Sequence, residues 1–239
     1  VLSYYEVAKE ENPFLGMRSI RFSLTHIDIF KEQIRAILRS AVHSDVKIMF
    51  PMISSIDEFL QSKEIVNECI HELKKESKQC NMKPKIGMMI EIPSVIHIID
   101  EFAKHADFFS IGTNDLIQYT IAVDRTNEKV SDLYVPHHPS ILRSLHAVAN
   151  AAKNANIDVS VCGDMASNEA YIPFLIGIGI TSLSVDSMYI PGVKKVIFDL
   201  DVHEAKEYSN ALLSLSTLKE TTELIERTLK KHDLLHSTN

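Results

Sequence analysis

Short apolar segments alternating with amphipathic ones constrain the fold of this 239-residue chain more than any other feature. The apolar segments are nearly continuous in hydrophobicity and end in polar residues or glycine, which is typical of strands covered on both faces. We expect strands at residues 20–24, 46–52, 85–93, 107–113, 158–164 and 182–186. Helical periodicity appears at residues 27–42, 57–78 and 140–154, and two further helices are expected between 202 and about 235. This order predicts parallel βαβ units.

Six predicted strands leave the type of parallel sheet open. A doubly wound sheet accommodates six strands, whereas a (β/α)8 barrel needs eight, and periodicity does not choose between them. The length of the chain suits a single domain of either type. Both architectures bind ligands at the carboxyl ends of their strands, so polar residues at those positions are the candidates for a site.

Charge and cysteine content exclude several classes of protein. The net charge of −7 argues against a nucleic-acid binder, which needs a basic face. No run of 18 or more apolar residues is present, so we expect no membrane insertion. Three cysteines without a C-x-x-C spacing suit a reducing compartment, and no signal peptide is visible. We therefore expect a cytoplasmic protein, and the first residue, Val1, indicates a piece of a longer chain.

Polar residues end three of the predicted strands. Glu91 closes one strand, Asn114 and Asp115 follow the next, and Cys162 closes a third. Two carboxylates from different strands suit Mg²⁺, which prefers oxygen ligands and keeps several waters. Asn114 and Asp115 could equally cap a following helix. Capping explains Glu91 poorly, because it lies between two isoleucines and precedes Pro93, and a carboxylate in an apolar strand usually has a cationic partner.

Residues 107–125, DFFSIGTNDLIQYTIAVDR, contain an apolar strand, S-x-G-T-N-D-L, a glutamine and D-R. This pattern resembles the signature of the phosphoenolpyruvate-utilising enzymes. Residues 118–127, QYTIAVDRTN, are more similar to the enzyme I family of the bacterial phosphotransferase system than to pyruvate phosphate dikinase or phosphoenolpyruvate synthase. Further segments resemble enzyme I in order and spacing: 11–21 (ENPFLGMRSIR), 33–40 (QIRAILRS), 48–52 (IMFPM), 86–93 (IGMMIEIP) and 161–166 (VCGDMA).

The resemblance implies that residues 1–239 form one phosphoenolpyruvate-binding domain of (β/α)8 TIM-barrel type. It implies a magnesium-dependent transferase that moves the phosphoryl group of phosphoenolpyruvate to a protein histidine and yields pyruvate. The histidine would lie on a separate domain of the same parent protein. That domain would pass the group to a histidine-containing phosphocarrier protein, as the first step of sugar transport by the phosphotransferase system. Members of the family are homodimers, so a dimer is expected as well.

The resemblance also implies roles for individual residues. Arg18, in G-M-R, and Arg125, in D-R, would bind the phosphoryl group, since the planar guanidinium matches a phosphate in a bidentate manner. Asn114 and Asp115 would line the substrate site. Glu91 and Asp115 would hold Mg²⁺, which would stabilise charge on the departing enolate.

Cys162 is implied to be the acid that protonates the methylene carbon of the enolate. A thiol of ordinary pKa, about 8.5, stays protonated near neutrality and can give its proton to a strong carbon base. The residues alone leave a plainer interpretation open for two positions. Cys162 could be a small apolar side chain that fills the end of the barrel, and Arg18 could form a surface ion pair.

Several features of the family pattern are missing from the chain. We find neither the first two strands of the barrel, with their further arginine and GGDK segment, nor a phosphohistidine domain. Asp186 stands where a small serine is expected, and its carboxylate would oppose an anionic ligand. These departures predict a barrel without its first two strands, inactive by itself. They also leave open a non-catalytic module for phosphoenolpyruvate binding or dimerisation, or a relative of the dikinase and synthase.

Overall fold

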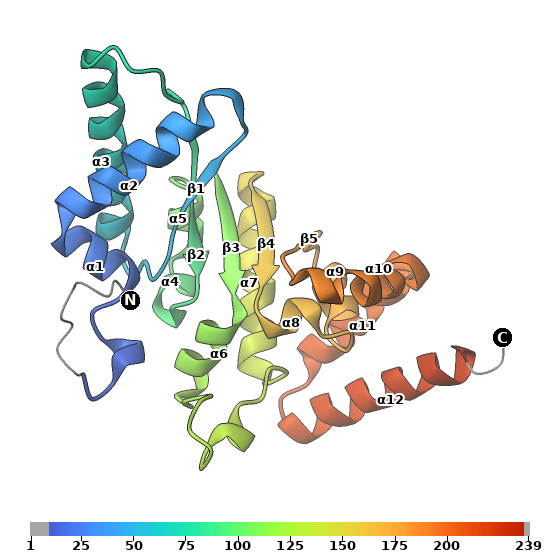
Figure 1. The fold of residues 1–239 in the computed structure, drawn as a ribbon. Helices are drawn as coiled ribbons and strands as arrows, with labels where there is room; N and C mark the ends of the chain where they lie inside the picture. The colour runs from blue at the N-terminus through green and yellow to red at the C-terminus, as the bar shows by residue number, and fades with distance from the viewer. Residues whose placement is uncertain (1–9, 237–239) are drawn as a thin grey trace.

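Five parallel strands form one sheet in the computed structural model, which describes residues 10–236 (Figure 1). The strands are β1 (Lys47–Phe50), β2 (Lys85–Ile90), β3 (Phe108–Gly112), β4 (Asp158–Cys162) and β5 (Ser182–Leu183). They follow one another in the sheet in the order of the sequence. A doubly wound sheet reverses its strand order at a switch point, so this sequential order argues against that alternative. Within the described residues β1 and β5 are the two edges, and the sheet is open.

The strand predicted at residues 20–24 is wrong, because this segment is helical. It belongs to α1 (Ser19–Thr25), which leaves five strands rather than six. Ile20 and Leu24 fit the period of a strand, but their i, i+4 spacing also places them on one face of a helix. Within this helix Ser23 Oγ donates to the carbonyl of Ser19, and Thr25 Oγ1 donates to that of Arg21.

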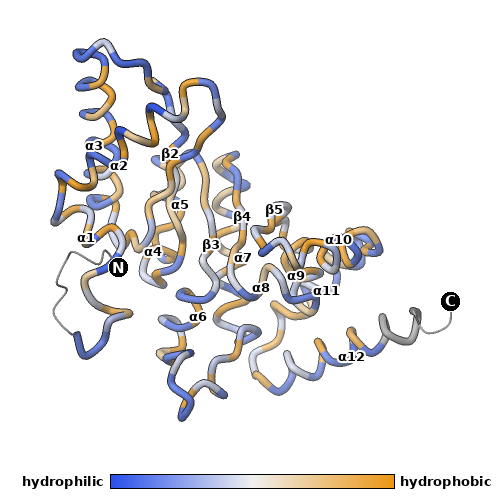
Figure 2. The backbone as a smooth tube through the Cα atoms, viewed as in Figure 1, coloured by the Kyte–Doolittle hydropathy of each residue, from blue (hydrophilic) through white to orange (hydrophobic). Residues whose placement is uncertain are grey.

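The other predicted strands and helices are confirmed. The three internal helices are α2 (Ile27–Ser40), α3 (Ile56–Lys75) and α7 (Pro139–Ala155), and the last two are α11 (Val202–Ser214) and α12 (Leu218–His236). A capping box between Ser55 and Glu58 begins α3, and Pro139 begins α7. Along α12 hydrophilic and hydrophobic residues alternate, as expected of a helix with one face on the protein (Figure 2). The shorter elements are η1 (Pro13–Leu15), η2 (Ala41–His43), α4 (Pro93–Ile96), α5 (Ile99–Ala103), α6 (Thr113–Ile121), η3 (Ser131–Leu133), α8 (Asp164–Ser167), α9 (Ile172–Gly177), η4 (Ser187–Tyr189) and α10 (Ile190–Asp199).

The two faces of the sheet differ in composition. One face carries large apolar side chains. Phe50 of β1 lies on this face and begins a series of edge-to-face contacts with phenylalanines of α2, α3 and α5: Phe30, Phe59 and Phe102. The register places Gly112 beside Cys162 and Ser110 beside Ser160 on the opposite face. That face therefore carries small and polar residues near its carboxyl end, where polar site residues can be accommodated.

Two adjacent histidines in the loop before α7 have a structural role. His137 Nδ1 lies 3.1 Å from the hydroxyl of Tyr171, and its Nε2 lies 2.8 Å from Thr222 Oγ1. These contacts connect the loop with the residue before α9 and with α12. Among the described helices, none combines the length and the apolar character that crossing a membrane requires.

Candidate functional site

The carboxyl ends of the three central strands bring the predicted residues together. Glu91 directly follows β2, Asp115 lies in the first turn of α6 after β3, and Cys162 is the last residue of β4. Arg18 arrives from the segment before α1 and Arg125 from the loop after α6. In Figure 1 the arrows of β2, β3 and β4 point toward this end of the sheet, where α6 and α8 lie.

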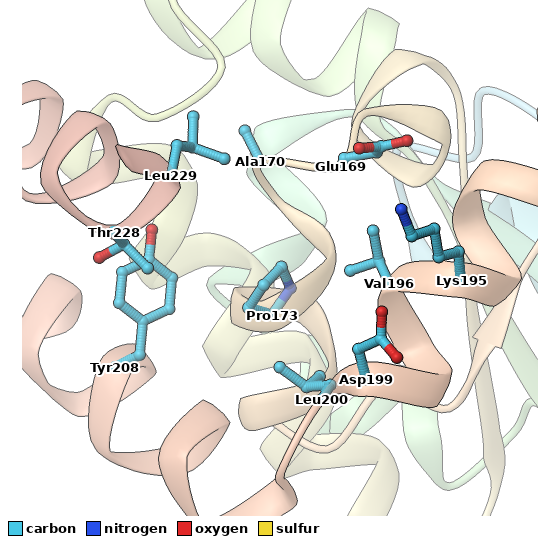
Figure 3. A pocket seen from close by; sticks show the side chains of 10 residues that line it. All are labelled: Glu169, Ala170, Pro173, Lys195, Val196, Asp199, Leu200, Tyr208, Thr228 and Leu229. Carbon is cyan, nitrogen blue, oxygen red and sulfur yellow. The ribbon is translucent and has the colours of Figure 1, made fainter. Parts of the chain in front are cut away.

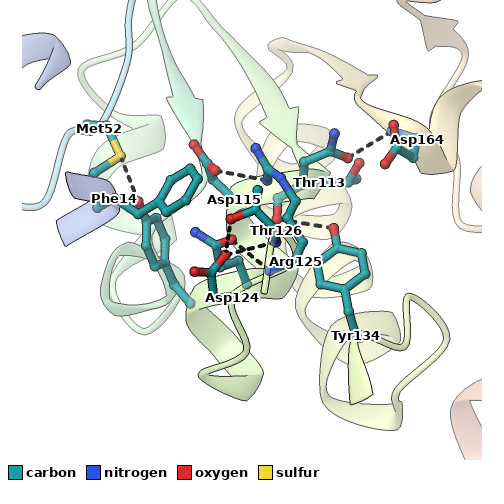
Figure 4. A network of polar contacts seen from close by, with 12 residues as sticks. Phe14, Met52, Thr113, Asp115, Asp124, Arg125, Thr126, Tyr134 and Asp164 are labelled. Carbon is teal, nitrogen blue, oxygen red and sulfur yellow. Dashed lines mark hydrogen bonds and ion pairs between the residues drawn. The ribbon is translucent and has the colours of Figure 1, made fainter. Parts of the chain in front are cut away.

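Asp115 is the centre of a charged network (Figure 4). Its Oδ2 accepts a hydrogen bond from Arg18 Nη2 at 3.2 Å, and its Oδ1 accepts one from Arg125 Nη1 at 3.0 Å. The Asp115 side chain is 10% exposed, and those of Arg18 and Arg125 are 32% and 28% exposed. One nearly buried carboxylate is thus shared by two guanidinium groups that remain accessible to a ligand. Arg18 thus forms an ion pair, as the sequence left open, but its partner is a nearly buried carboxylate at the strand ends.

The neighbouring Asn114 connects two strand ends. Its Oδ1 accepts a hydrogen bond from the backbone N–H of Asp164, at 2.8 Å, rather than one from its own helix. α6 begins without a side-chain cap, so neither Asn114 nor Asp115 has the capping role that the sequence left open. Gly163, with φ of 87°, makes the close approach possible, because a Cβ there would lie 2.6 Å from Asn114 Oδ1.

Glu91 is a buried carboxylate beside this network. It is 5% exposed, and its Oε1 accepts a hydrogen bond of 2.6 Å from the backbone N–H of Met52. Burial raises the pKa of Glu91; the charge of Asp115 acts in the same direction, while the Met52 hydrogen bond and the two arginines oppose it. Gly112 leaves room for the second oxygen, since a Cβ at that position would lie 3.0 Å from Glu91 Oε2.

The oxygen donors of Glu91 and Asp115 are of the kind that a magnesium ion prefers. The described residues contain no group of three or more His, Cys, Asp or Glu side chains that could hold a metal ion. Mg²⁺ does not need such a group, because it commonly takes one or two carboxylates and completes its shell with waters and substrate phosphate. A buried carboxylate with a raised pKa also gains from a nearby cation.

Cys162 is a half-buried thiol on the same face of the sheet. Its Sγ donates to the carbonyl of Ile111 at 3.5 Å. Burial raises the pKa of Cys162, a hydrogen bond with Ser110 opposes the shift, and the charge of Glu91 adds to it. The group is therefore a neutral thiol at pH 7, as proton donation requires.

Three aromatic residues that we did not single out from the sequence complete the site. The hydroxyl of Tyr119 donates to the carbonyl of Phe14, and Arg18 Nη1 lies 3.4 Å from the same hydroxyl. Tyr134 donates to the carbonyl of Asn114 at 3.1 Å, and burial raises the pKa of Tyr134 to about 12. Tyr119 could have been found, because it follows Asp115 by four residues in α6 and so shares its helix face. Nothing local in the sequence signals Tyr134.

Two cavities are present, one beside this charged network and one away from it. One of about 490 Å³ lies between residues 11–15 and α6, and it is lined by Phe14, Tyr119 and Gln118 among others. The other, of about 220 Å³, lies between the C-terminal helices and includes Pro173, Lys195, Tyr208 and Thr228 (Figure 3). None of the predicted site residues lines either cavity. The candidate site is therefore defined by the charged residues at the strand ends.

Comparison with known proteins gives a family match over most of the chain. Residues 1–202 match the family model described as "PEP-utilising enzyme, PEP-binding domain". A phosphoenolpyruvate-protein phosphotransferase of Mycoplasma capricolum is 44% identical over 232 residues, and that of Bacillus subtilis is 44% identical over 229 residues. These alignments cover 97% and 96% of this chain but 40% of each relative, so the chain spans about two fifths of their length.

A solved structure shares the fold. A citrate lyase from Burkholderia xenovorans LB400 superimposes with a TM-score of 0.53, covering 84% of this chain and 69% of its own. The two sequences are 16% identical, so this likeness concerns the arrangement of helices and strands alone.

Proposed function

The chain belongs to the family of phosphoenolpyruvate-utilising enzymes and matches their phosphoenolpyruvate-binding domain, and from this premise we propose that it binds phosphoenolpyruvate for phosphoryl transfer to a protein histidine. The proposed reaction is that of a phosphoenolpyruvate-protein phosphotransferase, the name its relatives carry, and we propose that it depends on magnesium. In that proposal residues 1–239 act as one barrel-type domain within a larger protein.

The observation that carries the proposal is the sharing of Asp115 between Arg18 and Arg125. Two partly exposed guanidinium groups within reach of one carboxylate form a site for a doubly charged anion, because each can form paired hydrogen bonds with phosphate oxygens. Asp115 holds the arginines in place while no anion is bound. An arriving phosphoryl group would take over these hydrogen bonds and leave the carboxylate free to act as a ligand.

The proposed mechanism divides the work among the residues of the site. Arg18 and Arg125 bind and orient the phosphoryl group and neutralise its charge, which is the main contribution a protein makes to phosphoryl transfer. Asn114, fixed by its contact with Asp164, borders the substrate. Glu91 and Asp115 would hold Mg²⁺, which supplies Lewis-acid stabilisation of the charge on phosphate and enolate oxygens.

Cys162 acts after the phosphoryl group has left. Its S–H bond breaks as a C–H bond forms at the methylene carbon, the enolate becomes the ketone of pyruvate, and a thiolate remains to be reprotonated from water. A thiol whose pKa is raised by burial retains its proton until a strong carbon base is present. The carbanion character of the enolate provides that base.

The remaining parts of the proposal concern partners. The acceptor would be a histidine of another domain of the parent protein, and a histidine-containing phosphocarrier protein would follow. We propose a cytoplasmic homodimer, as in the family that the sequence resembles. A second candidate is a module that binds phosphoenolpyruvate without turnover. The open five-stranded sheet favours it for the isolated chain.

Calorimetric titration of the chain with phosphoenolpyruvate, with and without MgCl₂, tests the proposal. We expect saturable binding that is stronger with magnesium and is lost in an Arg18→Gln/Arg125→Gln double variant. Arg21→Gln is the matched control, because Arg21 lies near Arg18 but donates to the carbonyls of Leu15 and Gly16. Absence of binding, or equal loss in the control, would contradict the proposed site.

A further inference from the structure

The ring of Phe14 lies against both arginines of the site. The Cζ atom of Arg18 is 5.6 Å from the ring centroid, and that of Arg125 is 5.7 Å from it. A cation within about 6 Å of an aromatic ring is attracted to the negative charge of its π face. One ring therefore contacts two like charges that arrive from segments far apart in the sequence. Figure 4 shows Phe14 beside the network around Asp115 and Arg125.

The backbone of Phe14 is fixed independently of these contacts. Phe14 lies in the short turn η1, which begins at Pro13. Its carbonyl accepts a hydrogen bond from Tyr119, and the Tyr119 hydroxyl is itself within 3.4 Å of Arg18 Nη1. Tyr119 belongs to α6, the helix that carries Asp115. Through Tyr119, Phe14 is therefore anchored to α6, the helix that also carries the carboxylate shared by the two arginines.

Packing does not by itself hold the ring in this position. Phe14 also lines the cavity of about 490 Å³ between residues 11–15 and α6, so core side chains of the described residues do not enclose it. It is half-buried, and its neighbour Leu15 is 63% exposed. The charged contacts of the ring are therefore a specific feature of its position, and they are not a by-product of dense packing.

Two arginines at one site need help to stay together. Their charges repel, and each long side chain loses rotamer entropy when it is fixed against a ligand. A ring that already restrains both guanidinium groups lowers that cost when an anion binds. Asp115 supplies the same restraint in the free state but has to give up hydrogen bonds to the anion, whereas an aromatic face competes for none of them.

We propose that Phe14 is a positioning residue that holds Arg18 and Arg125 side by side for the anionic group of the ligand. The identity of that ligand as phosphoenolpyruvate rests on the proposed function; the placement of the arginines by the ring does not. The side chain acts through its π face, so an apolar side chain of similar size does not replace it.

Phe14→Leu removes the ring, Phe14→Tyr retains it, and Leu15→Ala is the matched control in the same turn. The first measurement is the NMR resonance of each arginine Nε–Hε group, assigned with Arg18→Lys and Arg125→Lys. We expect ring-current shifts in the wild-type and Phe14→Tyr chains and their loss in Phe14→Leu. The second measurement is the Kd for phosphoenolpyruvate with MgCl₂. It should weaken about tenfold in Phe14→Leu, from the scale of cation–π contacts, and stay within about twofold in the other two chains.

Unchanged arginine resonances in Phe14→Leu would overturn the inference whatever the ligand. Lost shifts with an unchanged Kd would overturn it as well, because the ring would then not assist binding. If circular dichroism shows that Phe14→Leu misfolds, Phe14→Met serves as the second chain without a ring. Should the wild-type chain show the shifts but bind no phosphoenolpyruvate, the proposed function fails, and the Kd for inorganic phosphate then decides the inference by the same comparison.

Discussion

Replacing Asp115 with asparagine separates the two tasks that the structure gives to this carboxylate. Asparagine has nearly the same shape but carries no charge, so the variant keeps the packing of α6 and removes the anion between Arg18 and Arg125. In the free protein Asp115 accepts hydrogen bonds from both arginines, at 3.2 and 3.0 Å. In the proposed complex it is a magnesium ligand. The two tasks predict opposite effects on anion binding with and without magnesium.

The loss of stability can be estimated from these two contacts. A hydrogen bond to a charged group contributes about 1.5–3 kcal/mol, and the partial exposure of both arginines argues for the low end of that range. The single carbonyl oxygen of asparagine retains one weaker bond, of about 1 kcal/mol. We therefore expect the free energy of unfolding to fall by about 2 kcal/mol. With a urea m-value of about 3 kcal/mol/M, the unfolding midpoint falls by about 0.7 M.

Anion binding is the sharper measurement on the same variant. Without magnesium, Asp115→Asn should bind phosphoenolpyruvate more tightly than the wild-type chain, because the arginines no longer have an internal carboxylate as competitor. With magnesium, the wild-type affinity should rise and that of the variant should not. Asp124→Asn is the control: Asp124 is exposed, precedes Arg125 and accepts hydrogen bonds from Thr126. Weaker metal-free binding in Asp115→Asn, or a retained magnesium effect, would refute this reasoning.

Four further outcomes are expected. Glu91→Gln should abolish the effect of MgCl₂ on phosphoenolpyruvate affinity while the circular dichroism spectrum stays unchanged. Arg125→Lys should weaken calorimetric binding by about 1–3 kcal/mol, because lysine lacks the planar fork, and an unchanged Kd would remove Arg125 from the site. In the reconstituted full-length parent, Cys162→Ala should leave substrate binding intact but slow pyruvate formation by orders of magnitude and abolish the facial selectivity of protonation. Normal turnover in this variant would show that Cys162 is structural. Burial lowers the pKa of His137 below its value in the unfolded chain, so the folded state binds fewer protons. The free energy of unfolding should therefore fall as the pH drops below about 6.5. In urea melts His137→Gln should flatten this pH dependence, whereas His43→Gln, at an exposed position, should not.

The sequence predicted the strands well where burial on both faces left a continuous apolar run. It failed at residues 20–24, because alternating apolar residues four apart fit one face of a helix as well as one face of a strand. Closure of the sheet is a different matter, since it depends on which strands are present and not on the pattern of any one of them.

The candidate site was predictable as a set of residue types and not as a set of contacts. A carboxylate within an apolar strand and polar residues after the next strand indicated a charged site at one edge of the sheet. The partners were not predictable in the same way. Arg18 and Asp115 are 97 residues apart in the sequence, and Glu91 takes the N–H of Met52 from the end of another strand. Such contacts depend on tertiary packing, which no local pattern encodes.

An open sheet is nevertheless compatible with a well-ordered site, because the site uses its centre. Glu91, Gly112 and Cys162 end or follow β2, β3 and β4, and each of these strands is paired on both sides within the described sheet. The edges at β1 and β5 therefore need not be covered for these residues to be in place. Arg18 differs, since it comes from outside the sheet and depends on Asp115, Tyr119 and Phe14. Local unfolding of the isolated chain should consequently weaken anion binding through Arg18 first. The carboxylates and the thiol at the strand ends should be disturbed only later.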